Sequence, residues 1–505
     1  MKKVILLPLD ERPCNALYPS LLPTTDLALV VAPRYLLGHK KTPADIAPLQ
    51  AWLLKECHQA DFLVLSFDML IYGGLVPSRL HALSETTLLE RASFVETLKK
   101  DNPNLRIFAF ELLMRCPFYS LSDEEPDYYA REGSSIFKSG YYPDKAKETP
   151  LTQAEQEDYR KALGNINHGD LNDYLSRRDK NLHVLEHNLS YLSSGLIERL
   201  IVPNDDSSPY GYTARDKRSF FAYLKENRLE QKVLNYPGAD ELGLSSLAAV
   251  NLLAAGKKLK VYPCYACPEG PEVIPSFEDR SLSFSVPAQI AAAGCEMVSN
   301  SEQADFVLAI NVAPRMLEPN EEGFHHVYEE ERNLHAFVEK IHSFLKAGRP
   351  VALADIALAN GSEGALLHLL DSKGDLLELL AYAGWNTSGN TLGSTLGEAV
   401  LAYCGQDKKK NQQFLLYRYY EDYGYMSVVR NGYLDPYLVS HPFLSPFLLD
   451  GVDGPAAHGV GLGIARTMAE SFPSLARHVL RVNAYSPWNR SFEVELHLTF
   501  GGDLA

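Results

Sequence analysis

The sequence predicts an α/β protein built around a mainly parallel sheet. The first observation is a series of short apolar runs rich in β-branched residues, from residues 4–9 to residues 351–354. The second is that helical patterns, such as 44–58 and 329–346, lie between most of these runs. Alternation of this kind is typical of βα units, in which helices cover both faces of a parallel sheet.

The apolar runs and the helical patterns also limit the architecture. We expect strands at residues 4–9, 27–32, 62–66, 107–110, 200–203, 233–236, 259–263, 306–312 and 351–354. We expect helices at 44–58, 85–99, 214–227, 244–255, 286–293 and 329–346. These elements fit a catalytic region like a (β/α)8 barrel with one extra strand. The alternative is two Rossmann-like α/β lobes, divided near residue 256.

Two segments depart from this rhythm. An acidic, aromatic insertion is predicted at residues 117–197, and a long excursion from a βα edge is usually a lid or a substrate-binding subdomain. After residue 405 the chain becomes rich in tyrosine and ends in an alternating, strand-like run at 491–500. We therefore predict a catalytic region over residues 1–405 and a C-terminal accessory region over 406–505.

Composition excludes several classes of protein. Asp and Glu outnumber Lys and Arg by 64 to 48, and a net charge of -16 argues against a nucleic-acid or anionic-membrane partner. No apolar stretch approaches the roughly 20 residues that span a bilayer, and Asp10, Glu11 and Arg12 interrupt the apolar start before a signal sequence forms. We expect a cytoplasmic protein that binds a small glycan or glycoside and that is able to form oligomers.

Polar residues collect directly after the predicted strands, where ligand sites lie in parallel α/β sheets. Each such residue has an ordinary alternative, because Asp and Asn cap helices and Asp–Arg pairs form structural ion pairs. Doubled acids at several strand ends are less well explained by capping. The predicted substrate-binding residues at these positions are Asp10, Arg12, Asp68, Tyr72, Arg79, Glu111, Asp240, Glu241 and Asn360.

Asp205 and Asp206 are the predicted catalytic residues. They follow the strand at 200–203 and precede a turn that contains Tyr210, a further predicted ligand contact. At such a junction both carboxyl groups can enter one pocket, where like charge and burial raise one pKa and leave the other group ionised. One acid would donate a proton and the other would stabilise charge. The alternative is a turn with two solvated Asp side chains.

The segment 382–393 is a second candidate for ligand binding. An indole face suits stacking on a sugar, and neighbouring amides complete hydrogen bonds to hydroxyls, so Trp385, Asn386 and Asn390 are predicted contacts. The alternative is a buried Trp beside the Gly-rich start of a helix. We expect no metal and no cofactor, because a single Cys-x-x-Cys at 264–267 and scattered His residues form no zinc pattern.

Several phrases together resemble the bacterial family catalogued as domain of unknown function 4127, over nearly the whole chain. They are Leu-Pro-Leu-Asp-Glu-Arg-Pro-Cys-Asn at 7–15, Tyr-Gly-Gly-Leu-Val-Pro-Ser-Arg at 72–79, Asn-Asp-Asp at 204–206 with Pro-Tyr-Gly at 209–211, Ala-Asp-Glu at 239–241, and Tyr-Ala-Gly-Trp-Asn-Thr-Ser-Gly-Asn at 382–390. The resemblance identifies relatives but implies little chemistry.

The Asp205–Asp206 pair is in addition similar to the catalytic pair of family 84 glycoside hydrolases and, in function, to the Asp-Glu pair of family 20. Both families are N-acetylhexosaminidases that use substrate assistance. This resemblance implies that Asp205 orients the 2-acetamido group and that Asp206 protonates the leaving oxygen. The rest of the sequence departs from both families.

The expected function is therefore that of a retaining β-N-acetylhexosaminidase acting on GlcNAc or GalNAc. Three alternatives stay open. One is an ordinary retaining or inverting glycosidase in which Asp206 pairs with Glu111 or Glu241. Another is a hydrolase that binds a divalent metal through carboxylates. The last is a sugar- or metabolite-binding protein without catalytic activity.

Overall fold

The computed structural model describes the 505-residue chain except for residues 25–26, 206, 315–331, 502–503 and 505. The chain divides into two compact units. Unit 1 comprises Met1–Glu11, Leu29–Gly243 and Phe277–Asp279, and unit 2 comprises Arg12–Ala28, Leu244–Ser276 and Arg280–Ala505. The chain therefore passes between the two units more than once.

Unit 1 contains a six-stranded sheet in the order β2-β1-β3-β4-β5-β6. The neighbouring strands β1 and β3, β3 and β4, β4 and β5, and β5 and β6 pair in parallel. Strands β3 and β4 are buried almost throughout, as expected for strands covered on both faces. The strands are β1 (Lys2–Leu7), β2 (Leu27–Val31), β3 (Phe62–Ser66), β4 (Arg106–Phe110), β5 (Arg199–Ile201) and β6 (Val233–Leu234).

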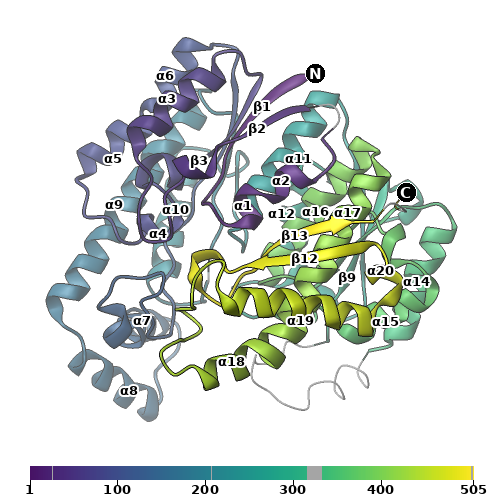
Figure 1. The fold of residues 1–505 in the computed structure, drawn as a ribbon. Helices are drawn as coiled ribbons and strands as arrows, with labels where there is room; N and C mark the ends of the chain where they lie inside the picture. Colours follow the sequence, from purple (N-terminus) through teal and green to yellow (C-terminus); the bar gives the residue numbers. More distant parts are fainter. Residues whose placement is uncertain (25–26, 206, 315–331, 502–503, 505) are drawn as a thin grey trace. The chain divides into compact units, whose positions relative to one another are not determined.

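Helices connect these strands, and polar caps fix where several of them begin. The side chain of Asp45 accepts a hydrogen bond from the N–H of Ala47 at the start of α3, and Thr152 and Glu155 form a capping box on α8. The helical elements are η1 (Arg34–Leu36), α3 (Ile46–Cys57), η2 (Asp68–Tyr72), α4 (Leu75–Ser78), α5 (Glu85–Ala92), α6 (Phe94–Asp101), α7 (Tyr129–Lys145), α8 (Gln153–Gly164), α9 (His168–Ser193) and α10 (Tyr212–Glu226). Figure 1 shows α3 and α6 side by side.

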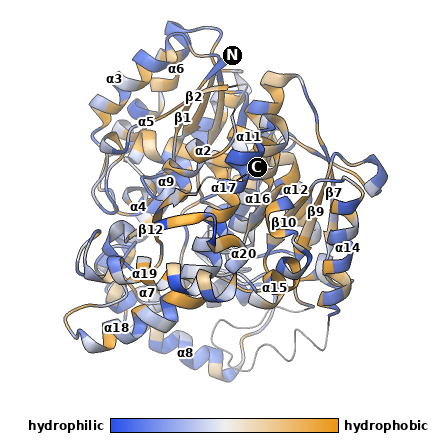
Figure 2. Ribbon diagram, turned by 45° about the vertical axis from the view of Figure 1, so that its right-hand side comes forward, coloured by the Kyte–Doolittle hydropathy of each residue, from blue (hydrophilic) through white to orange (hydrophobic). Residues whose placement is uncertain are grey.

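The segment predicted as an insertion, residues 117–197, contains the helices α7, α8 and α9 between β4 and β5. Tyr129, Ile136 and Tyr174 form a small buried cluster within it, together with Met114 and Cys116 from the segment after β4. In Figure 2, α8 is mostly hydrophilic. The insertion therefore has a small core of its own.

Unit 2 contains a five-stranded parallel sheet in the order β11-β10-β9-β7-β8. Strand β9 is buried at every position, and the central strands carry the apolar colour of Figure 2. A separate antiparallel hairpin of β12 and β13 lies beside α19 (Figure 1). The strands are β7 (Lys260–Tyr265), β8 (Glu296–Met297), β9 (Phe306–Asn311), β10 (Val351–Asp355), β11 (Ala381–Ala383), β12 (Val479–Tyr485) and β13 (Glu495–Phe500).

The helical elements of unit 2 include η6, a long segment with π-helical hydrogen bonding that continues α17. They are α1 (Pro13–Ala16), α2 (Tyr18–Leu21), α11 (Leu242–Ala255), η3 (Gly270–Glu272), α12 (Leu282–Ala292), η4 (Ser301–Gln303), α14 (Leu334–Lys346), α15 (Gly364–Lys373), η5 (Leu376–Glu378), α16 (Ser388–Gly405), α17 (Lys408–Arg418), η6 (Tyr419–Leu434), α18 (Asp435–Ser440), α19 (Pro455–Ser471), α20 (Pro473–Ala476) and η7 (Pro487–Asn489).

The two sheets share one topology. Numbered in chain order within each unit, five strands follow the order 2-1-3-4-5, and unit 1 adds a sixth strand after the fifth. The predicted α/β class with mainly parallel strands is confirmed. Two separate sheets match the alternative of two α/β lobes, and an eight-stranded barrel is not confirmed. In the described part of the chain, no helix is long and apolar enough to cross a membrane.

Candidate active site

The topology of unit 1 indicates where a ligand would bind. In a sheet of order 2-1-3-4-5 the chain changes direction between strands 1 and 3, and ligands of such sheets bind beyond the carboxyl ends of these strands. Asp10 follows β1 and Asp68 follows β3. Glu111 and Asp205 lie after β4 and β5, the next two strands along the same edge. Four of the predicted acids therefore belong to one edge of one sheet.

Arg79 binds the carboxylate of Asp205 at this edge. Its Nη2 donates to Oδ2 of Asp205 at 2.7 Å, and its Nη1 donates to Oε2 of Glu124 at 2.8 Å. The Arg79 side chain is 2% exposed, so both hydrogen bonds are shielded from water. Charge-assisted hydrogen bonds of this kind fix the orientation of a carboxylate.

Arg115 is a second guanidinium beside the same acids. Its Nε donates to Oε1 of Glu125 at 2.8 Å, and its Nη2 donates to Oε2 of Glu124 at 3.2 Å. Its Nη1 lies 3.9 Å from Oδ2 of Asp205. Two arginines thus face three carboxylates, with Glu125 fully buried and Glu124 and Asp205 partly exposed.

The two oxygens of Asp205 have different surroundings. Oδ2 faces both Arg79 and Arg115, whereas Oδ1 has no hydrogen bond to any residue that the structure describes. The Asp205 side chain is 16% exposed. One oxygen is therefore fixed by the protein, and the other is left to accept a hydrogen bond from a ligand.

Asp68 is a buried acid of a different character. It is 1% exposed and is the first residue of η2, a short π-helical segment. Its Oδ2 accepts a hydrogen bond from the N–H of Leu112 at 3.1 Å. Burial raises the pKa of Asp68 to about 7, against the opposing effects of the Leu112 N–H and of Arg79. Asp68 therefore changes charge near neutral pH, within the electrostatic reach of Asp205.

Glu111 and Tyr72 extend this buried polar group. Oε2 of Glu111 accepts a hydrogen bond from Nδ2 of Asn188 at 2.7 Å, and burial, followed by the charge of Asp68, raises the pKa of Glu111 well above its ordinary value. The hydroxyl of Tyr72 is buried and has no hydrogen bond to a described residue. Burial, followed by the charges of Glu111 and Asp68, raises its pKa. Burial thus favours the neutral form of the Glu111 carboxyl group.

Unit 2 carries a buried polar cluster at the same place in its own sheet. Nδ2 of Asn311, at the end of β9, donates to Asp355 and to Glu363, each at 2.7 Å, and Arg332 binds both Asn311 and Glu363. Tyr382 donates its hydroxyl to Ser362 at 2.6 Å. These side chains bond one another and are at most 5% exposed. This cluster supports the fold and presents no exposed carboxylate.

A second buried cluster in unit 2 surrounds Arg418. The guanidinium binds both oxygens of Asp422 at 2.7 and 2.8 Å and Oε2 of Glu421 at 2.9 Å. Tyr18 donates its hydroxyl to the same Glu421 oxygen. Burial raises the pKa of Glu421 and of Asp422, and Arg418 opposes this effect. The side chains are nearly inaccessible, so this cluster too is structural.

A family model described as "Protein of unknown function (DUF4127)" matches residues 4–497. The chain belongs to this family. No curated protein matches it. In the part of this DUF4127 protein that the structure describes, no group of three His, Cys, Asp or Glu side chains is arranged to bind a metal ion. The similarity to glycoside hydrolase families 84 and 20 stays an expectation.

The structure of this DUF4127 chain brings together five of the predicted site residues: Asp68, Tyr72, Arg79, Glu111 and Asp205. Asp206, the predicted proton donor, lies outside the described residues. Asp10 is in the same unit and is 2% exposed.

Three further predicted contacts of unit 1, Asp240, Glu241 and Tyr210, are buried or hydrogen-bonded to nearby protein groups. Oε2 of Glu241 accepts the N–H of Ala239 at 2.8 Å, so this side chain folds back on its loop, and the neighbouring Asp240 is 6% exposed. The hydroxyl of Tyr210 donates to Glu148 at 3.0 Å. These contacts favour the local structural explanation for Glu241 and Tyr210.

The other predicted contacts belong to unit 2. Arg12 lies 3.3 Å from Glu493 and over the ring of Trp488. Trp385 is 2% exposed and offers no face for stacking in this structure. Asn360 and Asn386 adopt left-handed backbone conformations, with the Asn360 N–H donating to the Asn386 carbonyl at 3.1 Å, and Asn390 donates to Oγ1 of Thr387.

Sequence reasoning missed three parts of this DUF4127 site. Glu124 and Glu125 were visible as an acidic pair in the insertion, but nothing in their spacing connected them to Arg79, which lies 45 residues from Glu124. Asn188, on α9, carries no distinguishing signal. Arg115 follows β4 closely and was recognised with Glu111 as a polar residue after a strand, but it was not among the predicted contacts.

Proposed function

We propose that this protein is a glycoside hydrolase with its active site at the carboxyl edge of the six-stranded sheet in unit 1. The proposed reaction is removal of β-linked GlcNAc or GalNAc by substrate-assisted, retaining catalysis. The observation that carries the proposal is the state of Asp205. Arginines fix one of its oxygens, its other oxygen is available to a ligand, and its side chain keeps contact with solvent.

In the proposed first step the acetamido oxygen of the substrate attacks the anomeric carbon. The bond from this carbon to the leaving oxygen breaks, and Asp206 gives its proton to that oxygen. Oδ1 of Asp205 accepts the acetamido N–H and stabilises the oxazolinium intermediate. In the second step water attacks the anomeric carbon, the ring of the intermediate opens, and Asp206 takes a proton from the water.

Asp68 and Glu111 would act as positioning residues. Both are at most 2% exposed, so neither is placed to touch a substrate. Because their pKa values are raised, they add little negative charge beside Asp205 below neutral pH. Arg79 and Arg115 then offset the charges of Asp205, Glu124 and Glu125. Two groups of acids with different protonation states in one site are the usual basis of acid–base catalysis.

The proposal is tested with chromogenic glycosides of GlcNAc and GalNAc, compared with those of glucose and galactose. We expect cleavage of the N-acylated sugars only, unchanged by a chelator. Asp205→Asn keeps the shape of the side chain and should lower kcat about 100-fold or more, because it removes the charge that stabilises the intermediate. Asp206→Asn should lower kcat by several orders of magnitude.

Asp101→Asn, at an exposed position in unit 1, is the matched control and should leave kcat within about twofold. Circular dichroism of each variant separates loss of activity from loss of fold. Wild-type turnover by folded Asp205→Asn would remove the proposed role of Asp205. Activity lost on chelation would favour a hydrolase that binds a divalent metal through carboxylates.

A second candidate is a sugar- or metabolite-binding protein without catalytic activity. It is favoured by the division into two α/β units with the same strand order. Calorimetry that detects tight binding of a glycan, together with no product after hours of incubation, would support this candidate and exclude the hydrolase.

A further inference from the structure

A polar groove lies in unit 2 at the amino ends of β10 and β11, the opposite edge of the sheet from the polar cluster around Asp355. Two adjoining cavities form it, with volumes of about 550 and 320 Å3. Pro350 and Leu380, which directly precede β10 and β11, line the larger cavity. Both volumes suit a small-molecule ligand. The residues that line both cavities are Gly374, Leu377, Glu378, Lys408 and Gln412.

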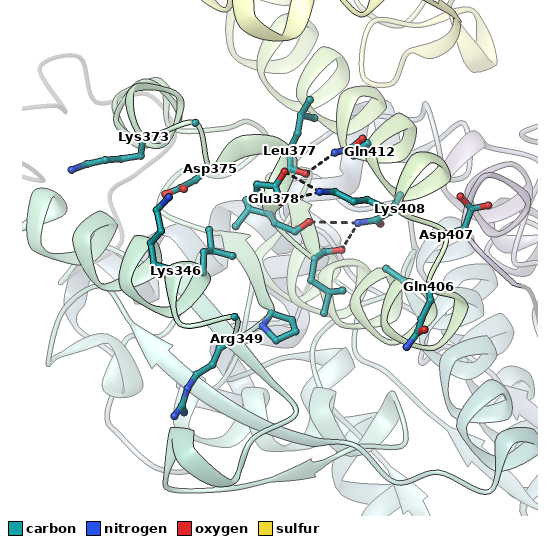
Figure 3. Close-up of a pocket in the computed structure, with 18 residues that line it drawn as sticks. Lys346, Arg349, Lys373, Asp375, Leu377, Glu378, Gln406, Asp407, Lys408 and Gln412 are labelled. Carbon is teal, nitrogen blue, oxygen red and sulfur yellow. Dashed lines mark hydrogen bonds and ion pairs between the residues drawn. The ribbon is translucent and has the colours of Figure 1, made fainter. Parts of the chain in front are cut away.

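The acidic side chains of the groove already have partners. Lys408 binds both oxygens of Glu378 at 3.1 Å, as Figure 3 shows. Asp375 accepts from Nδ1 of His342, and Asp407 caps α17 by accepting the N–H of Lys410. In the smaller cavity, Asp371 accepts the hydroxyl of Ser474. These contacts offset or disperse the negative charge of the groove.

Two cations of the groove have no acidic partner among the described residues. Lys346, the last residue of α14, lines the larger cavity and makes no hydrogen bond or ion pair with them. Figure 3 shows it extending toward Asp375, whereas the charged ends of Arg349 and Lys373 point away from Glu378. Arg477 lines the smaller cavity, and its guanidinium contacts only Nε2 of His478 within the described chain.

Helix α17, whose first residue lines the groove, carries further positive charge outside the residues that line the two cavities. Helix α17 begins with Lys408, Lys409 and Lys410. A helix has partial positive charge at its N-terminus, so lysines in the first turn are electrostatically unfavourable. The side chains of Lys409 and Lys410 have no partner among the described residues. An anion in the groove would offset this repulsion.

We propose that the groove binds an extended small molecule with two anionic groups, one beside Lys346 and the other beside Arg477. The shared chemistry of the ligand is a pair of phosphates or carboxylates, which lysine binds as a point charge and arginine binds through its planar fork. This site is independent of the proposed active site in unit 1. The groove is lined by five Lys or Arg side chains and four Asp or Glu side chains, on a chain whose net charge is -16.

Calorimetry on the full chain at low ionic strength tests the proposal. The probes are fructose 1,6-bisphosphate and ribulose 1,5-bisphosphate, whose phosphates are well separated, for the phosphate source, the dipeptide Glu-Glu for the carboxylate source, and inorganic phosphate as the single anion. We expect at least one of the first three to bind, and to bind about tenfold or more tightly than inorganic phosphate. The class that binds identifies the source of the anionic groups.

Two charge reversals and one control complete the experiment. Lys346→Glu and Arg477→Glu should each weaken binding of the preferred probe by about tenfold or more. Lys257→Glu changes an exposed lysine of the same unit outside the groove and should leave the affinity within about twofold. No binding of either bisphosphate or of the dipeptide by the wild-type protein, or equal binding by both groove variants, overturns the proposal.

Discussion

Replacing Asp68 by Asn should remove a specific part of the pH dependence of stability. Asp68 is 1% exposed, and burial raises its pKa from 3.8 to about 7. Folding therefore takes up a proton between these two pH values. The stabilising contribution of the protonated carboxyl is complete below pH 3.8, declines as the pH rises toward 7, and stays low above pH 7.

The size of this effect follows from the two pKa values. Their difference is about 3 pKa units, which corresponds to about 4 kcal/mol over the whole range. Linkage places about 3 kcal/mol of this loss between pH 5 and pH 8. Asn is neutral throughout, and its side-chain oxygen can still accept the N–H of Leu112 that Asp68 accepts at 3.1 Å.

Urea unfolding followed by circular dichroism at pH 5 and pH 8 measures the effect. The wild type contains other titrating groups, so the informative quantity is the free energy of unfolding of Asp68→Asn minus that of the wild type. We expect this difference to become more favourable to the variant by about 3 kcal/mol on going from pH 5 to pH 8. Glu230→Gln, at an exposed position in unit 1, should show almost no change. A difference for Asp68→Asn that is the same at both pH values would refute the reasoning.

Three further changes have defined outcomes. Arg79→Lys keeps the charge but cannot bind Glu124 and Asp205 at the same time, so urea unfolding should show a free energy of unfolding lower by about 3 kcal/mol. The exposed control Arg160→Lys should lower it by under about 0.5 kcal/mol. Equal losses in the two variants would contradict the structural role of Arg79. Burial raises the pKa of Glu421, so ionisation of this group should make the wild type less stable as the pH rises from 5 to 9. Glu421→Gln should lose less stability over this range, and thermal unfolding measures both proteins. Parallel pH profiles of the two proteins would contradict this role of Glu421. Gly238→Ala adds a methyl at a backbone φ of +153°, where it would clash with Oε1 of the buried Glu241, so it should cost about 2 kcal/mol or more. Gly374→Ala, at a φ of +73° in open space, should cost about 1 kcal/mol, and similar melting temperatures of the two variants would contradict the crowding.

The sequence predicted the long buried strands well and the short ones poorly. Strands such as β3 and β9 are continuous apolar runs, and their predicted bounds agree closely with the structure. Strands β8 and β11, of two and three residues, were not predicted, whereas β5 and β6, which are equally short, were predicted from the apolar runs at 200–203 and 233–236. The common strand order of the two sheets was not predicted for a different reason. Strand order depends on which strands pair, and it leaves no repeated motif in the sequence.

The candidate site was predictable where it depends on topology. Asp68, Glu111 and Asp205 follow neighbouring parallel strands, so a rule about strand ends was sufficient to group them. The rule did not predict which oxygen each acid presents, because that depends on Arg79 and on Glu124 from a distant segment. It also did not predict the burial of Trp385, since a Gly-rich helix start can either expose or cover an indole.

The early segment Arg12–Ala28 has a consequence for biosynthesis. Tyr18 belongs to it, packs against Phe414 and Tyr417, and donates its hydroxyl to Glu421, a residue 403 positions later. At 5–20 residues per second, the ribosome needs roughly 20 to 80 s to make the chain between Tyr18 and that partner. During this interval Tyr18 has not yet gained its native neighbours, while the residues on either side of the segment, in β1 and β2, can already join a growing sheet. Nascent chains paused before residue 414 should therefore be the ones that chaperones bind at this segment.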